Sequence, residues 1–139
     1  LCAIGGLSTS VAGADITRVA FVSTTFDVSD GGNIDVRVTF NEKVTVTGNP
    51  TLAITNNQNG GGSAASLTAA YVSGSGTNRL VFRKTLGAGA GDTADTNTLS
   101  VGAQNIALAG GTMKDTGTTT NSGVAIGATI VTNTVAVSG

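Results

Sequence analysis

Residues 38–54 read VTFNEKVTVTGNPTLAI, and this stretch decides the fold. Apolar and polar residues alternate along it. Such alternation is typical of a strand that buries one face, because successive side chains of a strand point to opposite sides of the sheet. The alternation is interrupted at the acidic-basic pair of residues 42–43 and again at the Gly-Asn-Pro of residues 48–50. Since proline lacks an amide donor and belongs at a strand start or a sheet edge, the stretch predicts strand segments separated by these two breaks.

The same period of two recurs elsewhere in the chain. It is clear in residues 16–22 (ITRVAFV) and 34–40 (IDVRVTF), while residues 67–72 (LTAAYV) and 79–86 (RLVFRKTL) flank a Gly/Ser-rich turn in the manner of a hairpin. The Thr/Val-rich residues 128–139 predict a closing strand. No segment has a sustained helical period, so short strands in an all-β sandwich or barrel are indicated, and we expect an antiparallel β-sandwich. The predicted core residues are Val19, Phe21, Ile34, Val36, Val38, Phe40, Leu52, Ile54, Leu80 and Phe82.

Length and composition limit the protein class. A chain of 139 residues falls within the usual size of one domain with a core of its own. Only 11% of the residues are charged and the formal net charge is −1, so no broad basic field would attract nucleic acid or an anionic membrane. No run of apolar residues is long enough for a membrane span. We therefore expect neither a nucleic-acid partner nor a membrane partner.

The residue types that most enzyme chemistry needs are scarce. The chain contains no His, so Ser-His-Asp and Cys-His arrangements cannot be built within it. Pairs of carboxylates remain, but a glycosidase also needs a sugar-binding cleft, usually with aromatic side chains, and the aromatic residues are only Tyr71 and four Phe. The glycine-rich residues 60–62 and 87–91 lack Walker-A spacing and predict loops. We therefore expect a protein that is not an enzyme.

One group of oxygen-bearing residues surrounds a Gly-Gly turn. Closely spaced carboxylate and amide oxygens are the ligands that calcium requires, and strand-end loops of extracellular β-domains often supply them. Asp and Asn also favour turns for their own reasons, because they accept bonds from nearby backbone amides. Both interpretations remain open for this group, and also for Asp92 and Asp95; apart from a structural calcium ion, no cofactor is expected. The candidate calcium ligands are Asp27, Asp30, Asn33 and Asp35.

The first residues read LCAIGGLSTSVAGAD and are small or apolar. Their Ala-Gly-Ala tripeptide, residues 12–14, has the form of a signal-peptide cleavage site, so this segment is either a remnant of a secretion signal or a retained N-terminal arm. The single cysteine, Cys2, cannot form an internal disulfide; it is either a small structural residue or a reactive or lipidated thiol. We expect an arm over residues 1–15 and a single domain over residues 16–139.

Five blocks of the chain resemble a known family in collinear order. They are IDVRVTF (residues 34–40), NEKVTVTGNPTL (residues 41–52), AYVSGSGTNRLVF (residues 70–82), GDTAD (residues 91–95) and IALAGGTMKD (residues 106–115). Together they resemble bacterial immunoglobulin-like repeats, which occur in tandem in large surface proteins and adhesins, with related modules in structural proteins of tailed phages. The resemblance covers about residues 16–116.

The resemblance implies an immunoglobulin-like antiparallel β-sandwich and no catalysis. The chain departs from the family by the extended segments at its N- and C-termini, residues 1–15 and about 117–139. Glu42 and Lys43 would form a solvent-facing break between two strands. The implied function is that of a structural protein in a surface assembly. We expect a decoration or cement protein of a phage virion, or another capsid- or tail-associated protein; the alternative is a secreted adhesin or filament module of the bacterial cell surface.

The two settings imply the same kind of partner. We expect protein neighbours in a capsid, tail or surface filament, including further copies of this chain, at the virion surface or, in the alternative, at the cell surface or outside the cell. Added strands bind through backbone hydrogen bonds and ask little of side chains. Residues 1–15 and 117–139 are therefore the segments expected to contact neighbouring subunits.

Overall fold

The computed structural model describes residues 14–89, 91–117 and 120–139. This part of the chain is all-β and contains no α-helix, so it also holds no helix that is long and apolar enough to span a bilayer. The strands are β1 (Ile16–Phe21), β2 (Thr25–Asp27), β3 (Gly32–Thr47), β4 (Thr51–Asn56), β5 (Ser66–Ser73), β6 (Thr77–Leu86), β7 (Thr98–Ser100), β8 (Gln104–Asn105), β9 (Thr112–Asp115), β10 (Ala125–Ile126) and β11 (Val135–Ser138), with the short 3-10 turn η1 (Ala128–Ile130) before the last.

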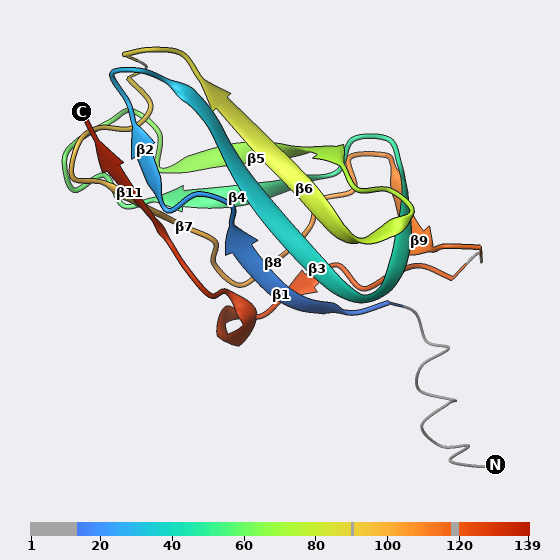
Figure 1. Cartoon of the computed structure of the whole chain (residues 1–139). Coiled ribbons are helices and arrows are strands. Elements are labelled where there is room, and N and C mark those ends of the chain that lie inside the picture. The colour runs from blue at the N-terminus through green and yellow to red at the C-terminus, as the bar shows by residue number, and fades with distance from the viewer. Residues whose placement is uncertain (1–13, 90, 118–119) are drawn as a thin grey trace.

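The main sheet is curled into a half-barrel (Figure 1). Its strand order is β1-β3-β6-β5-β4-β7-β11-β2, with β9 paired to β3 off this path, and β8 and β10 form a small second sheet. The predicted all-β class is confirmed. The prediction of a purely antiparallel arrangement is wrong, because β11 and β2 pair in parallel. Only residues 22–24 separate β1 from β2. Over this short connection the chain passes from one end of the strand order, where β1 pairs with β3, to the other end, where β2 pairs with β11.

Strand β3 is the longest, with 16 residues, and it pairs with β1, β6 and β9. The alternation read from the sequence places every second residue of its first half inward. Val36, for example, lies opposite Phe21 of β1 and Phe82 of β6, so that three buried side chains form one row across the sheet. Burial of such rows fixes the register, because a slip by one residue would turn the whole apolar set outward.

The first predicted break, at residues 42–43, is an irregularity inside a continuous strand. The pairing of β3 with β6 shifts register between Thr39 and Val44, and from Val44 onward β3 pairs with β9. Glu42 and Lys43 are exposed, as expected, and Val44 is buried again. The extra residues bend the strand without ending it, which is how a β-bulge acts. The expected pair of separate strands is therefore one strand, which pairs along one edge first with β1 and then with β9, and along the other edge with β6.

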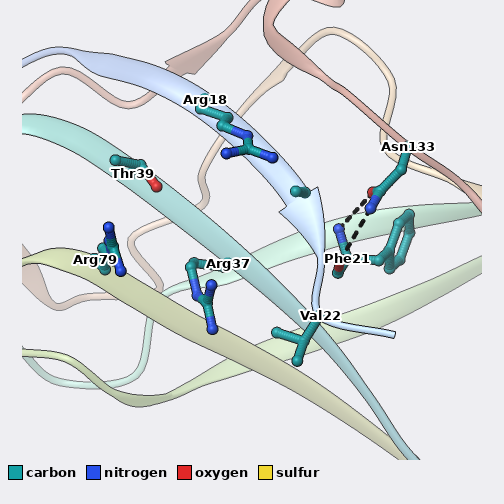
Figure 2. Close-up of a pocket in the computed structure, with 8 residues that line it drawn as sticks. Arg18, Phe21, Val22, Arg37, Thr39, Arg79 and Asn133 are labelled. Atoms are coloured by element: carbon teal, nitrogen blue, oxygen red, sulfur yellow. Dashed lines mark hydrogen bonds between the residues drawn. The ribbon is translucent and has the colours of Figure 1, made fainter. Parts of the chain in front are cut away.

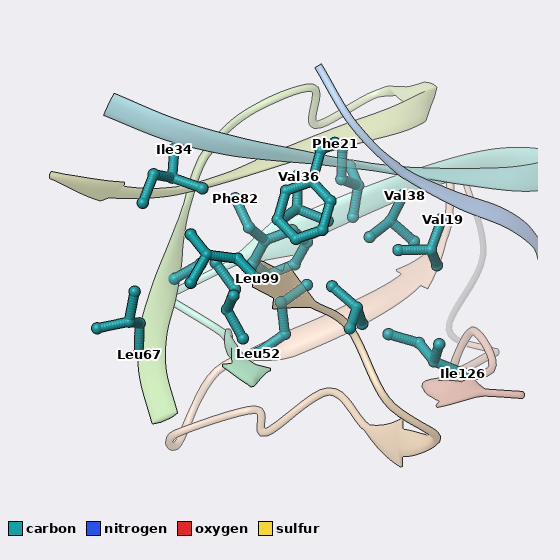
Figure 3. Packing of buried hydrophobic residues seen from close by; sticks show 14 of the residues in the cluster. Val19, Phe21, Ile34, Val36, Val38, Leu52, Leu67, Phe82, Leu99 and Ile126 are labelled. Carbon is teal, nitrogen blue, oxygen red and sulfur yellow. The ribbon is translucent and has the colours of Figure 1, made fainter. Parts of the chain in front are cut away.

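Every residue of the predicted core is buried, at 3% exposure or less. The hairpin predicted for residues 67–72 and 79–86 is formed by β5 and β6. Next to the core, Tyr71 meets the buried ring of Phe82 edge to face, with ring centroids 6.1 Å apart. Figure 3 shows the apolar side chains gathered between the strands of the curled sheet. Further strands add Val44, Leu67, Leu99, Met113, Val135 and Val137 to the core.

The loop predicted at the glycine-rich residues 60–62 is exposed, but two asparagines hold its base. The Asn56 amide nitrogen donates to the carbonyl oxygens of Ala64 and Asp92, at 2.7 and 3.0 Å. The Asn97 side chain accepts from the Gly60 nitrogen at 2.6 Å and donates to the Gly61 oxygen at 2.9 Å. Both asparagines are buried, so the glycine-rich loop is tied to the core by side-chain amides.

The two ends of the chain differ in what the structure describes. Residues 1–13, which include Cys2 and most of the expected arm, lie outside the described part. Ala14 is fully buried, and its nitrogen donates to the Asp115 carboxylate at 2.5 Å. At the other end, β11 lies between β7 and β2. The expected closing strand is confirmed, and the backbone of Val135–Ser138 is engaged within the sheet instead of being free for a neighbour.

Replacement of Phe40 by Ala tests the core. Phe40 is 1% exposed, so its truncation leaves a cavity, and we expect the free energy of unfolding to fall by about 3–5 kcal/mol. Urea denaturation measures the change. Val72, which is 45% exposed, offers a matched control: Val72→Thr keeps the β-branched shape and should change stability by less than about 0.5 kcal/mol. Equal effects of the two substitutions would contradict the assigned register.

Candidate functional site

A hollow of about 240 Å³ lies on the outer face of β1, β3 and β6, on the side of the sheet away from the core (Figure 2). Three arginines from three adjacent strands line it, one each from β1, β3 and β6. The hollow is smaller than the usual 300–1,000 Å³ or so of a pocket for a drug-sized ligand, which suits one or two small groups. Its lining residues are Arg18, Ala20, Phe21, Val22, Arg37, Thr39, Arg79 and Asn133.

The alternation that builds the core also aims these arginines outward. Arg37 stands between two buried valines of β3, and Arg18 and Arg79 each precede a buried residue of their own strand. Arg18 lies opposite Thr39, and Thr39 lies opposite Arg79, so these residues form one row across the sheet. Two strand spacings separate the Cα atoms of Arg18 and Arg79 by about 10 Å, and Arg37 lies about 7 Å from Thr39 along β3.

The three guanidinium groups carry charge without a partner in the described part of the chain. Arg18, Arg37 and Arg79 are exposed, and their side chains make no hydrogen bond or ion pair with residues 14–89, 91–117 or 120–139. They are three of the seven Lys and Arg residues in the sequence, so a large share of the positive charge is gathered at one place. Such a cluster favours binding of a negatively charged group.

A neighbouring pair on the same face shows the bonding that an arginine fork can make. Arg83 donates from Nε and from a terminal nitrogen to the two carboxylate oxygens of Asp35, at 2.7 and 3.0 Å. The hydrogen bond to Asp35 and then its negative charge raise the pKa of the Arg83 guanidinium. Paired N–H···O bonds of this kind are directional and recognise carboxylates specifically.

Two side-chain amides form hydrogen bonds to backbone groups at the edges of β1 and β4. At the hollow, Phe21 donates its backbone N–H to Asn133 Oδ1 at 2.7 Å, and Asn133 Nδ2 donates to the Phe21 carbonyl at 3.1 Å (Figure 2). On β4, Gln104 makes the same pair of bonds to the nitrogen and oxygen of Ala53, both at 2.8 Å. Each amide occupies the donor and acceptor that a further strand would use, which protects the edge from unwanted pairing.

The chemistry of the lining residues is that of binding. Guanidinium groups hold oxyanions but stay protonated, so they do not transfer protons at neutral pH. The lining set contains no carboxylate, lysine or cysteine. No sequence pattern predicted this hollow. The available signal was an arginine at an outward position on each of three strands, but only the long-range pairing of β6 with β3 brings Arg79 near the other two.

The predicted calcium ligands lie along β2, the following turn and β3. Asp27 Oδ1 accepts from the nitrogen and the hydroxyl of Ser29, at 2.9 and 2.6 Å, and these bonds lower the pKa of Asp27, the hydroxyl bond most. Asn33 Oδ1 accepts from the Thr85 hydroxyl at 2.7 Å. Asp35 is held by Arg83, and Asp30 lies in the exposed turn.

The structure therefore does not bring the four oxygen-bearing side chains to one point. Within the described ranges, no group of three or more His, Cys, Asp or Glu side chains is placed to hold a metal ion. Asp27 makes the turn contacts that its residue type favours. Asp35 faces a guanidinium from a strand far away in the sequence. The calcium site stays a prediction.

Comparison with known proteins gives no family assignment. No family model matches the chain, and neither the curated proteins nor the solved structures yield a match. The resemblance to immunoglobulin-like repeats thus stays a hypothesis from the sequence.

Calcium titration tests the predicted site. A ligand that binds only the folded protein raises its apparent stability, so the calcium hypothesis predicts a melting temperature that rises with calcium concentration. Asp30→Ala should abolish the rise, because it removes one of the predicted ligands. The fold should be unchanged, since the Asp30 side chain makes no hydrogen bond or ion pair within the described residues. Magnesium at the same ionic strength serves as the control. An unchanged melting temperature across millimolar calcium would leave these residues as turn and strand residues.

Replacement of Asn133 by Ala tests the side-chain amide at the edge of β1. The change leaves the backbone N–H and C=O of Phe21 without their partner, so we expect the free energy of unfolding to fall by about 1–2 kcal/mol. Thr134→Ala is the control, since Thr134 is exposed and its side chain makes no hydrogen bond within the described residues. Equal stability of the two variants in urea would show that water replaces the amide.

Proposed function

We propose that this protein is a non-catalytic structural module of a surface assembly and that its fold is an immunoglobulin-like sandwich. The strand order supports the second part. In such domains, strands A, B, E and D form one sheet and strands C, F and G the other. Here β1, β3, β6 and β5 are neighbours in the order A-B-E-D, and β4, β7 and β11 follow in the order C-F-G. The pairing of β4 with β5, which joins the halves into one curled sheet, departs from the ideal sandwich.

The main support for the assembly role is that the backbone groups at the edges of several strands are already hydrogen-bonded within the domain. Asn133 and Gln104 occupy the edges of β1 and β4, and β11 is paired on both sides. A domain of this kind folds around its own core and contacts neighbours through faces and loops. The positively charged hollow on β1, β3 and β6 is such a face. Binding without chemistry is what its lining residues support.

The first proposed setting is the surface of a phage virion, as a decoration or cement protein or another capsid- or tail-associated protein. The sequence resemblance to modules in tailed-phage structural proteins supports this setting. Neighbouring protein subunits, including copies of this chain, would then be the partners.

The alternative setting is a secreted adhesin or filament module of the bacterial cell surface, and one feature of the fold favours it. The described chain starts beside Asn41, to whose side chain Asp15 donates, and it ends beside Asp27 and Val28. Figure 1 accordingly places the start of β1 and the end of β11 at opposite ends of the domain, as modules linked in series require.

Immunogold electron microscopy tests the proposal. Antibodies raised against the purified chain are applied to cultures of the producing organism, with preimmune serum as the control. We expect gold on virus particles in the lysate. Label on the envelopes of intact cells would replace the virion setting by the cell-surface alternative, and label confined to the cell interior would overturn both.

A further inference from the structure

We propose that the hollow between Arg18, Arg37 and Arg79 binds a pair of carboxylates carried by an extended acidic segment of a partner protein. The outer surface of β1, β3 and β6 that carries Arg18, Arg37 and Arg79 is called the arginine face. The inference rests on the proposed assembly role for its biological meaning, because a module that contacts neighbours through faces needs a face with a defined partner chemistry. The carboxylate pair itself is inferred from the positions of the residues that line the hollow.

The spacing of the arginines favours two carboxylates over one compact ion. Arg18 and Arg79 are two strand spacings apart, about 10 Å between Cα atoms, and Figure 2 shows the three side chains spread around the hollow. A phosphate ion presents its oxygens within a few ångströms and would engage fewer of these forks at once. Alternate residues of an extended peptide are about 7 Å apart and point to the same side, so two acidic side chains at such positions match the arginines.

The local excess of positive charge on this face favours an acidic partner. Asp35 lies opposite Arg83 on the same outward surface, and its two oxygens are already bound by that guanidinium. The three arginines of the hollow have no such acid within the described chain. Because the formal net charge of the whole chain is −1, attraction to the hollow acts at short range and is weakened by salt. A short acidic segment suits this local field better than a long polyanion.

The apolar part of the hollow indicates that the partner is a peptide. Val22, at 52% exposure, and Ala20 line the hollow beside the arginines. The methylene groups of glutamate side chains can pack on these apolar atoms, whereas an inorganic ion gains nothing from them. Asn133 occupies the adjacent backbone groups of Phe21, so the segment lies across the arginine face and does not extend the sheet at this point.

Fluorescence anisotropy with a labelled peptide tests the inference on the full chain. The probe is the pentapeptide Thr-Glu-Thr-Glu-Thr with blocked ends, and the matched peptide carries Gln in place of both Glu. We expect saturable binding of the acidic peptide that weakens when salt rises from 50 to 200 mM. Arg37→Gln should reduce its affinity at least about tenfold, because charge-assisted bidentate bonds are lost. Arg37→Lys, which keeps the charge and loses the fork, should give an intermediate affinity.

Lys43→Gln is the control variant, since Lys43 is exposed, carries the same charge and does not line the hollow. It should change the affinity less than about twofold, and the melting temperature shows that each variant is folded. Equal binding of the Gln peptide, or equal effects of Arg37→Gln and Lys43→Gln, would overturn the inference. Inorganic phosphate that binds as tightly as the peptide would replace the carboxylate pair by a general anion site. None of these outcomes depends on where the protein resides, so the inference can fail while the assembly role stands.

Discussion

The register of β3 against β1 and β6 is the constraint on which the rest of the structure depends. The row of Phe21, Val36 and Phe82 fixes it through burial, and the two strands on either side follow. The same register sets the opposite face, because a residue between two buried positions must point outward. Arg37 is therefore placed next to the row of Arg18 and Arg79 by the packing of the core. A slip by one residue would bury the arginines and expose the apolar set, which makes this register hard to exchange.

The irregularity at residues 41–43 lets β3 pair with an additional strand, β9. Before it, β3 pairs with β1 along one edge; after it, Val44 and the residues that follow pair with β9 along that edge, while β6 pairs along the other edge up to Val44. One strand thereby connects the central half of the sheet to the segment that carries Met113 into the core. The charged residues of the bulge stay in water, so no charge is buried by the change of partner. The bend also lets the sheet curl around a single core, since bulges increase local twist.

Local features of this fold could be predicted from the sequence, and long-range pairings could not. Burial alternates within a strand, so Ile34, Val36 and Val38 were assigned to the core correctly. The parallel pairing of β2 with β11 joins residues more than a hundred positions apart, and no local pattern encodes it. The arginine face depends on the same kind of long-range contact. The calcium hypothesis illustrates the converse: Asp35 is near the other acids in the sequence, but its partner is Arg83, from a distant strand.

One residue, Asn133, both blocks the edge of β1 and lines the exposed hollow. Asn133 closes the backbone groups of Phe21 and also forms one wall of the hollow. A partner that approaches β1 at this point finds the backbone donor and acceptor of Phe21 already used, while the guanidinium groups a few residues away have no counter-charge among the residues that the structure describes. Backbone pairing is tolerant of sequence, whereas arginine forks discriminate among partners by charge and shape. In the proposed surface assembly, this arrangement would favour selective association through the arginine face over unspecific pairing of strand edges.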